Sequence, residues 1–153
     1  DAGVEQSTVL LEEPPERQSE LTQLRHFDTL VICDIGFPIP KNANVVDLSL
    51  VAGIPTFMQT LKAVLNEVIF AKYTIFDFME EANKEYYDEL HTIFKNQEAH
   101  TASMDAFRRL SADANLFIRT GETRPASNIL LEAASGDEWS VATYGVSFDD
   151  IGL

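Results

Sequence analysis

The stretch His26–Pro40, HFDTLVICDIGFPIP, decides the fold of this chain. Its centre, Leu30–Cys33, is a short apolar run rich in β-branched residues, and glycine and proline residues follow it. Such a run predicts a buried strand over Thr29–Asp34 that leaves the core into a rigid loop. Asp34 then lies at the carboxyl end of the strand, where α/β folds place their ligand sites. His26 lies just before the strand.

The segments on either side of this strand alternate between helical and extended patterns. Apolar residues at helical spacing predict helices, and short β-branched or aromatic runs predict strands. Helices are expected from Pro15 or Glu16 to Leu24, and at Pro55–Glu67, Asn83–Gln97 and Met104–Leu110, with Ser103 capping the last. Strands are expected at Thr8–Leu11, Val45–Leu50, Ile69–Phe78, His100–Ser103, Leu116–Arg119 and Asn128–Ala133, with an edge strand at Glu138–Phe148. The alternation predicts a single α/β domain with a mainly parallel central sheet flanked by helices.

The composition limits the classes of function. The chain has 153 residues, 45% of them hydrophobic, and its 11 basic residues face 25 acidic ones, for a formal charge of -14. This charge disfavours nucleic acid and anionic membranes as partners. It also disfavours anionic substrates unless a local basic pocket overrides the field, so a neutral substrate fits best. The sequence has no apolar run of membrane-spanning length and no signal peptide, which predicts a cytoplasmic protein.

The side chains that carry chemistry are few. The single cysteine, Cys33, is expected to be a small core residue, and the three histidines are too scattered to predict a metal site. No nucleotide- or cofactor-binding motif is present. His26 is either a general acid/base or a packing residue. Asp34 either binds ligand hydroxyls or accepts hydrogen bonds from the turn, and Arg119–Glu122 either holds sugar hydroxyls or forms a turn with an ion pair.

Five short segments in order resemble the RbsD/FucU family of cofactor-free sugar mutarotases. They are Leu24–Asp34, Gly36–Lys41, Gly53–Gln59, Ile118–Glu122 and Ser127–Leu131. The resemblance runs from about Thr8 to Ala133 and is closer to the D-ribose pyranase branch. It implies an RbsD-like domain over residues 1–133, including an N-terminal arm, and a C-terminal extension over residues 134–153.

The resemblance also assigns site residues. His26 matches the catalytic histidine of the family, and Asp34 matches the aspartate near it. Asn128 matches a sugar-binding asparagine, and Arg108 stands where the ribose branch has a lysine. Two further substrate-binding positions differ: Met104 replaces a second histidine and Ala126 replaces a tyrosine. These two changes predict a less polar and roomier pocket. The family uses neither a cofactor nor a metal.

The function implied is the cofactor-independent interconversion of ring forms or anomers of a free, ribose-like monosaccharide. Family members assemble into homo-oligomeric rings, decameric in the ribose branch, with active sites near subunit contacts. Two other functions stay open. One is a weakly active or inactive sugar-binding or assembly protein on the same ring scaffold. The other is an unrelated α/β binding domain, which would be a monomer without affinity for free sugars.

Overall fold

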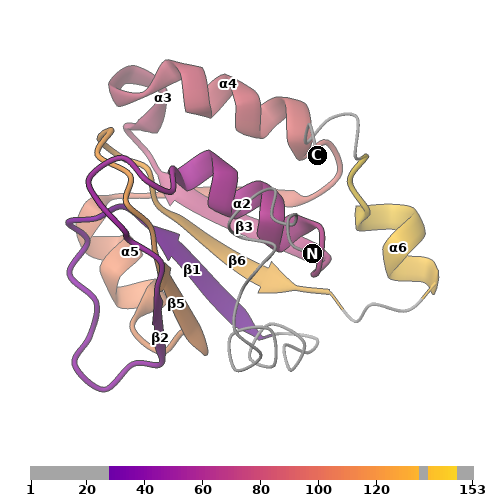
Figure 1. The fold of residues 1–153 in the computed structure, drawn as a ribbon. Coiled ribbons are helices and arrows are strands. Elements are labelled where there is room, and N and C mark those ends of the chain that lie inside the picture. Colours follow the sequence, from indigo (N-terminus) through magenta and orange to yellow (C-terminus); the bar gives the residue numbers. More distant parts are fainter. Residues whose placement is uncertain (1–27, 135–137, 148–153) are drawn as a thin grey trace, which may run out of the picture.

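A six-stranded sheet forms the centre of the molecule (Figure 1), for which a computed structural model describes residues 28–134 and 138–147. The strands lie in the order β2-β5-β1-β6-β3-β4. β6 runs antiparallel to both of its neighbours, and the other pairings are parallel. The prediction of a mainly parallel sheet is therefore confirmed. The strands are β1 (Thr29–Cys33), β2 (Val45–Asp47), β3 (Phe70–Phe76), β4 (Glu98–Ala102), β5 (Leu116–Arg119) and β6 (Ile129–Ala133).

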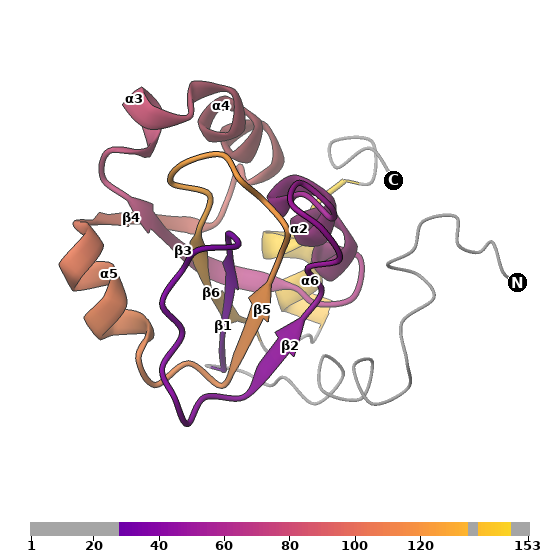
Figure 2. The same cartoon turned by 60° about the vertical axis from the view of Figure 1, so that its left-hand side comes forward.

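Helices cover both faces of this sheet. They are α2 (Phe57–Leu65), α3 (Met79–Ala82), α4 (Lys84–Ile93), α5 (Met104–Ser111) and α6 (Glu138–Tyr144). The connections through α2 and α4 cross the sheet in one direction, whereas the connection through α5 returns in the other. Right-handed crossovers therefore put α5 on the opposite face from α2 and α4, and Figure 2 shows α5 on the far side of the strands from α2.

The predicted helices and strands between β1 and β6 are all present, with ends that shift by a few residues. Thr56 caps α2 in a capping box with Gln59, and Ser103 caps α5 as predicted. The core is built on β1, in which Leu30 through Cys33 are completely buried. Cys33 is thus the core residue that the sequence predicted, and burial raises the pKa of its thiol to about 12.

The C-terminal segment differs from its prediction. Glu138–Phe148 was expected to add an edge strand, but Glu138–Tyr144 forms α6 and Phe148 lies outside the described residues. β2 and β4 occupy the two edges of the sheet, and α6 instead packs beside the amino end of β3. The Gln97 side chain donates a hydrogen bond of 2.6 Å to the carbonyl oxygen of Tyr144. The predicted strand at Thr8–Leu11 and the helix ending at Leu24 also lie outside the described residues.

Candidate functional site

The candidate site residues gather where the parallel strands end. β1, β3, β4 and β5 share one direction, so their carboxyl ends meet at one edge of the sheet together with the amino end of β6. Asp34 directly follows β1, and Asn128 directly precedes β6. This is the edge at which α/β proteins bind ligands. Two of the predicted site residues, Asp34 and Asn128, therefore lie at this edge on neighbouring strands.

Asp34 and Asn128 are held together by a reciprocal pair of hydrogen bonds. The backbone N–H of Asp34 donates to Asn128 Oδ1 at 2.9 Å, and Asn128 Nδ2 donates to Asp34 Oδ2 at 3.3 Å. The other carboxylate oxygen of Asp34 accepts from the backbone N–H of Gly36 at 3.1 Å. The first contact fixes the orientation of the Asn128 amide, because only its oxygen can accept from a backbone N–H. Asp34 thus stabilises its turn and faces a second polar side chain at the same time.

The environment of Asp34 favours its protonated form. Burial raises the pKa of the Asp34 carboxyl above its usual value, although the hydrogen bonds from Asn128 and Gly36 act in the opposite direction. Asn128 itself is 2% exposed, so its amide is held in one position by its surroundings. The pair therefore presents one carboxylate that can accept hydrogen bonds and one amide that both donates and accepts.

The loop that carries Asn128 is anchored to α4. The Asn83 side chain donates to the carbonyl oxygen of Pro125 at 3.2 Å and to Ser127 Oγ at 3.1 Å. Between these contacts lies Ala126, which is buried and has a φ of 59°. A non-glycine residue with positive φ costs about 1 kcal/mol. The contacts of Asn83 on both sides stabilise this conformation and so hold Ala126 beside Asn128.

Glu122 is the structural centre of this loop, which the sequence did not predict. Its side chain is 3% exposed and accepts four hydrogen bonds. Oε1 accepts from Phe57 N and Tyr86 Oη at 2.9 and 2.7 Å, and Oε2 accepts from Thr123 N and Arg124 N at 3.1 and 3.0 Å. Burial alone raises the pKa of Glu122, but these hydrogen bonds outweigh it and hold the pKa below its usual value.

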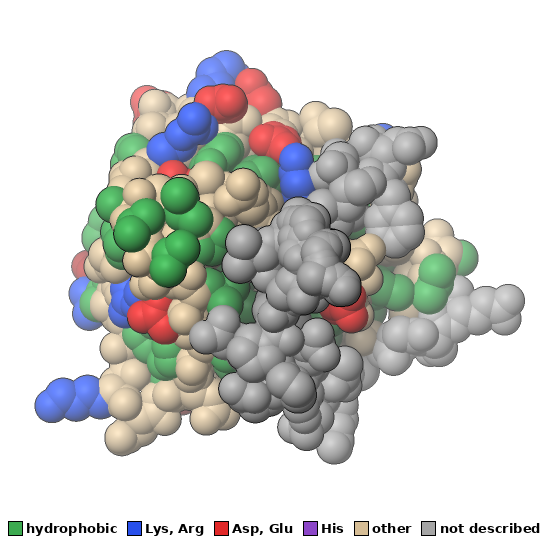
Figure 3. All heavy atoms as spheres, viewed as in Figure 1, with side chains coloured by type: hydrophobic (Ala, Val, Ile, Leu, Met, Phe, Trp, Pro, Cys, Tyr) green, Lys and Arg blue, Asp and Glu red, His purple; other side chains and the backbone are tan. Residues whose placement is uncertain are grey.

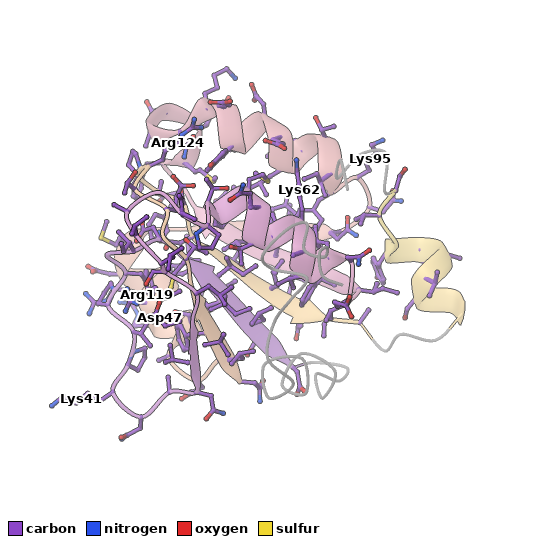
Figure 4. All side chains as sticks on the ribbon, viewed as in Figure 1. Lys41, Asp47, Lys62, Lys95, Arg119 and Arg124 are labelled. Atoms are coloured by element: carbon purple, nitrogen blue, oxygen red, sulfur yellow. The ribbon has the colours of Figure 1, made fainter. Side chains whose placement is uncertain are left out.

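The backbone of Glu122 links the two halves of the site. Its carbonyl oxygen accepts from the N–H of Ile35, at 3.0 Å, directly after Asp34. Arg119 donates to the carbonyl oxygen of the same Ile35 at 2.7 Å and lies 3.9 Å from the Asp47 carboxylate, toward which Figure 4 shows it directed. The ion pair of Arg119 therefore involves Asp47 and not Glu122. The Arg119–Glu122 segment thus runs from the end of β5 into the loop that Glu122 holds in place.

The close packing of Gly121 against the segment Val51–Ile54 can be tested by mutation. A Cβ atom at Gly121 would lie 2.6 Å from the carbonyl oxygen of Val51 and closer still to that of Ile54, so backbone has to move. We expect Gly121→Ala to lower the free energy of unfolding by about 2 kcal/mol. Gly36→Ala is the control, because its Cβ would meet only Asp34 Oδ1 at 4.0 Å. Urea unfolding of both variants measures the difference, and equal stabilities would contradict this packing.

Met104 begins α5, just after the carboxyl end of β4, and so lies at the same edge of the sheet as Asp34 and Asn128. Met104 and Arg108 are one turn apart on α5, and both are exposed. Arg108 lines an open groove of about 510 Å³ that Phe37–Pro40 and α5 enclose. Neither Asp34 nor Asn128 lines this groove. A single chain therefore brings Asp34, Ala126 and Asn128 together, and Arg108 lines a groove that neither Asp34 nor Asn128 lines.

Of the three histidines, His91 and His100 lie in the described part of the chain, whereas His26 lies outside it. His91 is exposed on α4, where its Nδ1 lies 2.8 Å from the carbonyl oxygen of Tyr87, and His100 on β4 pairs with Glu98. Within residues 28–134 and 138–147, no three His, Cys, Asp or Glu side chains are grouped as a metal ion would need. In the same ranges, every helix is too short or too polar to cross a membrane.

Comparisons with known proteins show the family to which the chain belongs. The model of the RbsD / FucU transport protein family matches residues 14–135. A D-ribose pyranase from Petrotoga mobilis is 41% identical over 111 residues, which cover 72% of this chain and 85% of that protein. A D-ribose pyranase from Haemophilus influenzae is 34% identical over 119 residues, covering 72% and 86%.

A solved structure extends the likeness to three dimensions. RbsD of Bacillus subtilis, solved in complex with D-ribose, superposes with a TM-score of 0.76 at 33% identity, covering 79% of this chain and 92% of that one. The match of fold, sequence and segment order spans most of the chain. This protein is therefore a member of the RbsD/FucU family.

Proposed function

We propose that this protein is a cofactor-independent mutarotase that interconverts the ring forms or anomers of a free monosaccharide. The observation that supports it most is the Asp34–Asn128 pair at the carboxyl edge of the sheet. The family context adds to it, since relatives at 33–41% identity are named D-ribose pyranase and one solved relative holds D-ribose.

The chemistry requires a proton to leave one oxygen and another to arrive at a second. Opening a cyclic hemiacetal removes the proton of the anomeric hydroxyl and protonates the ring oxygen, which breaks the bond between that oxygen and the anomeric carbon. Closing through the same or another hydroxyl reverses these transfers. In the proposal His26 exchanges the protons, because an imidazole titrates near neutral pH. Asp34 orients hydroxyls as an acceptor, Asn128 both donates and accepts, and Arg108 donates.

The pocket in this proposal is less polar than a ribose site of the family. Met104 and Ala126 offer no side-chain hydrogen bond where the family has a histidine and a tyrosine. A substrate hydroxyl left without a partner there would lose about 1–3 kcal/mol of binding. We therefore infer that the substrate resembles ribose but has fewer hydroxyls at these positions or a larger substituent.

We infer further that the site is completed between copies of the chain in a homo-oligomeric ring. Arg108 lines a groove that Asp34 does not line, which supports this, since a neighbouring copy can supply a cation to the site of Asp34. An exposed apolar surface supports it as well. Leu50, Val51 and Ile54, between β2 and α2, are 74%, 55% and 52% exposed, and Figure 3 shows hydrophobic side chains gathered over this segment. Light scattering of the full chain tests it, and a monomer would contradict it.

The activity itself is tested by saturation-transfer NMR on a panel of free aldoses and deoxysugars. The exchange between anomeric and ring-form signals reports catalysis directly. We expect faster exchange for at least one sugar, and His26→Ala to reduce that rate by about a hundredfold while sugar binding is retained. His91→Ala is the matched control, because this exposed histidine interacts with its own helix. Equal rates for wild type and His26→Ala would contradict the role of His26.

The second candidate is a sugar-binding or assembly protein without useful catalysis. The apolar residues Met104 and Ala126 at two polar positions of the family favour it. It predicts that sugars bind to the wild type without any faster exchange in the same experiment, and that light scattering still finds an oligomer.

A further inference from the structure

The end of β3 brings aromatic side chains to the carboxyl edge of the sheet. β3 pairs antiparallel with β6 up to Ile75 and Ile129. The same register, continued by one residue, places Phe76 across from Asn128. Residues directly opposite each other in an antiparallel pair direct their side chains to the same face. Phe76 packs on the face that α5 covers, because its ring meets Phe107 of α5 edge-on with 4.9 Å between the centroids. Phe76 is thus a neighbour of Asn128 on the α5 face of the sheet.

Phe78 is the outermost of a row of packed aromatic rings. Its ring stacks on that of Phe76, with 5.0 Å between the centroids. Phe76 in turn packs edge-on against Phe107, and Phe107 packs edge-on against Phe37 at 5.8 Å. Phe37, Phe76 and Phe107 are buried, whereas Phe78 is partly exposed. The buried rings therefore hold the ring of Phe78 in place on the α5 face, and its exposed part is open to a ligand.

Met104 stands at the same level as Phe78 on the neighbouring strand. The last pair between β3 and β4 joins Phe76 to Ala102. Phe78 and Met104 each lie two residues beyond this pair. The N–H of Asp77 donates to the carbonyl oxygen of Ala102 at 2.8 Å, which continues the pairing past the strand ends. Met104 is 51% exposed, so its thioether adds to the apolar surface that Phe78 begins.

Ala126 reaches the same level from the other side of β3. It precedes Asn128 by two residues. The Asn83 side chain, at the start of α4, donates to the carbonyl oxygen of Pro125 at 3.2 Å and so ties this loop to the segment that follows Phe78. The ends of β4, β3 and β6 thus carry three apolar side chains, one each, just beyond the sheet.

A sugar bound at this edge therefore meets two different surfaces. The Asp34–Asn128 pair offers hydrogen bonds to hydroxyl groups. The other surface, which we call the apolar rim, offers none from its side chains and consists of Phe78, Met104 and Ala126. A hydroxyl group turned toward the apolar rim loses its contacts with water without gaining a partner. A carbon that carries only hydrogen loses nothing there and packs against the aromatic ring.

We propose that Phe78 selects a deoxypentose as the substrate. The hydroxyls of the sugar bind the Asp34–Asn128 pair, and the carbon that lacks a hydroxyl packs against Phe78. The assignment rests on the proposed function for the place of the sugar. It also decides between the two kinds of substrate inferred above, because a ring held by buried neighbours does not yield to a larger substituent. Phe78 then determines specificity and takes no part in the exchange of protons.

Binding and exchange are measured separately on the full-length protein with D-ribose, 2-deoxy-D-ribose and 5-deoxy-D-ribose. Calorimetric titration gives the affinities, and saturation-transfer NMR gives the exchange. We expect at least one of the deoxypentoses to bind about tenfold more tightly than D-ribose. We expect Phe78→Gln, which places a polar amide at the apolar rim, to reduce this preference to about twofold or less. The preference is a ratio of two affinities, so a general loss of stability does not change it.

Two further variants make the test independent of folding. Met104→Gln changes an exposed side chain, so the fold tolerates it, and we expect it to lower the preference about threefold. Tyr87→Gln is the matched control and is expected to keep the preference. Tyr87 is a partly exposed aromatic residue on α4, and its ring lies against His91 of the same helix with 4.3 Å between the centroids.

The outcomes separate this proposal from the mutarotase. Wild type that binds D-ribose as tightly as both deoxypentoses would overturn the role of Phe78. An unchanged preference in Phe78→Gln and Met104→Gln, or an equal loss in Tyr87→Gln, would overturn it as well. In these cases exchange of any of the sugars would leave the mutarotase standing. A preference for a deoxypentose that is lost in Phe78→Gln, without exchange of any sugar, would refute the mutarotase and support the assignment of Phe78.

Discussion

Replacing Glu122 by alanine is expected to lower the free energy of unfolding by about 4 kcal/mol. The variant leaves four donors without their acceptor: the buried Phe57 N–H and Tyr86 hydroxyl, and two partly buried backbone N–H groups in the loop. Each buried donor without a partner costs about 1–3 kcal/mol. The loss also loosens the connection to Ile35, whose N–H donates to the Glu122 carbonyl oxygen. Sugar exchange is therefore expected to fall together with stability.

Glutamine at position 122 tests the reason for this effect. Its amide nitrogen faces Phe57 N–H in one orientation and the N–H groups of Thr123 and Arg124 in the other. In the better orientation the glutamine oxygen faces Thr123 and Arg124, and its amide nitrogen faces the Phe57 N–H. Two donors then point at each other at Phe57, while the Tyr86 hydroxyl can turn to accept a hydrogen bond from the amide. We therefore expect an intermediate loss of about 2 kcal/mol for Glu122→Gln.

Urea unfolding as a function of pH measures both effects. The pKa of Glu122 is lowered in the folded protein, so its carboxylate stabilises the fold above its usual pKa of 4.5, and this contribution is lost as the pH falls through the folded pKa. The difference between wild type and Glu122→Gln should therefore shrink in acid. Glu85→Ala is the control, because Glu85 pairs with Arg124 at the surface and its side chain is 74% exposed. A Glu85→Ala loss as large as that of Glu122→Ala would refute the network.

Local pattern was sufficient to predict the framework of the site. The apolar run of β1 predicted a strand over Thr29–Asp34, which forms as Thr29–Cys33, and the run Leu116–Arg119 predicted β5 with its bounds. Ser103 predicted the start of α5 because a serine before an amphipathic segment satisfies its first N–H groups. The parallel direction of the strands then followed from their alternation with helices. These features depend on short segments whose patterns agree with the final fold.

The features that the sequence did not predict depend on distant partners. Glu122 reads as a polar turn residue, and only the arrival of Tyr86 and Phe57 from two helices makes it a buried acceptor. The pattern around Val141 fits both a strand and a helix, and the structure forms α6 there. Arg108 lines a groove that Asp34 does not line because of the path that α5 takes across the sheet. The spacing of residues along the chain does not predict that path.

Replacing Asn128 by aspartate is expected to lower the free energy of unfolding by about 3 kcal/mol at neutral pH and sugar exchange by about a hundredfold. The new carboxylate oxygen would lie 3.3 Å from Asp34 Oδ2, where Asn128 Nδ2 now donates. A buried and a partly buried carboxylate at this distance repel each other strongly, so the pair binds a proton at neutral pH that the unfolded chain has released. The pKa of the pair is raised on folding, and the cost therefore grows as the pH rises above about 3.9 and disappears below it.

The double variant Asp34→Asn/Asn128→Asp separates stability from chemistry. Asp at position 128 still accepts from the backbone N–H of residue 34, and Asn at position 34 supplies the donor that position 128 lost. Its amide oxygen still accepts from Gly36 N–H, so every hydrogen bond of the pair is kept, and only the one between the two side chains reverses its direction. We expect its stability to return to within about 1 kcal/mol of wild type. Asp47→Asn is the control for removing a carboxylate at this edge, because Asp47 is half-exposed and pairs with Arg119 only at 3.9 Å.

Exchange activity is expected to stay at least tenfold below wild type in the double variant. The reason is that the carboxylate that accepts hydrogen bonds has moved from residue 34 to residue 128. Urea unfolding and saturation-transfer NMR on the same sample give the two quantities. Recovery of both would mean that the site needs one negative charge and not a carboxylate at Asp34. Recovery of stability alone would assign Asp34 a direct role in holding the sugar, since the fold around it is then intact.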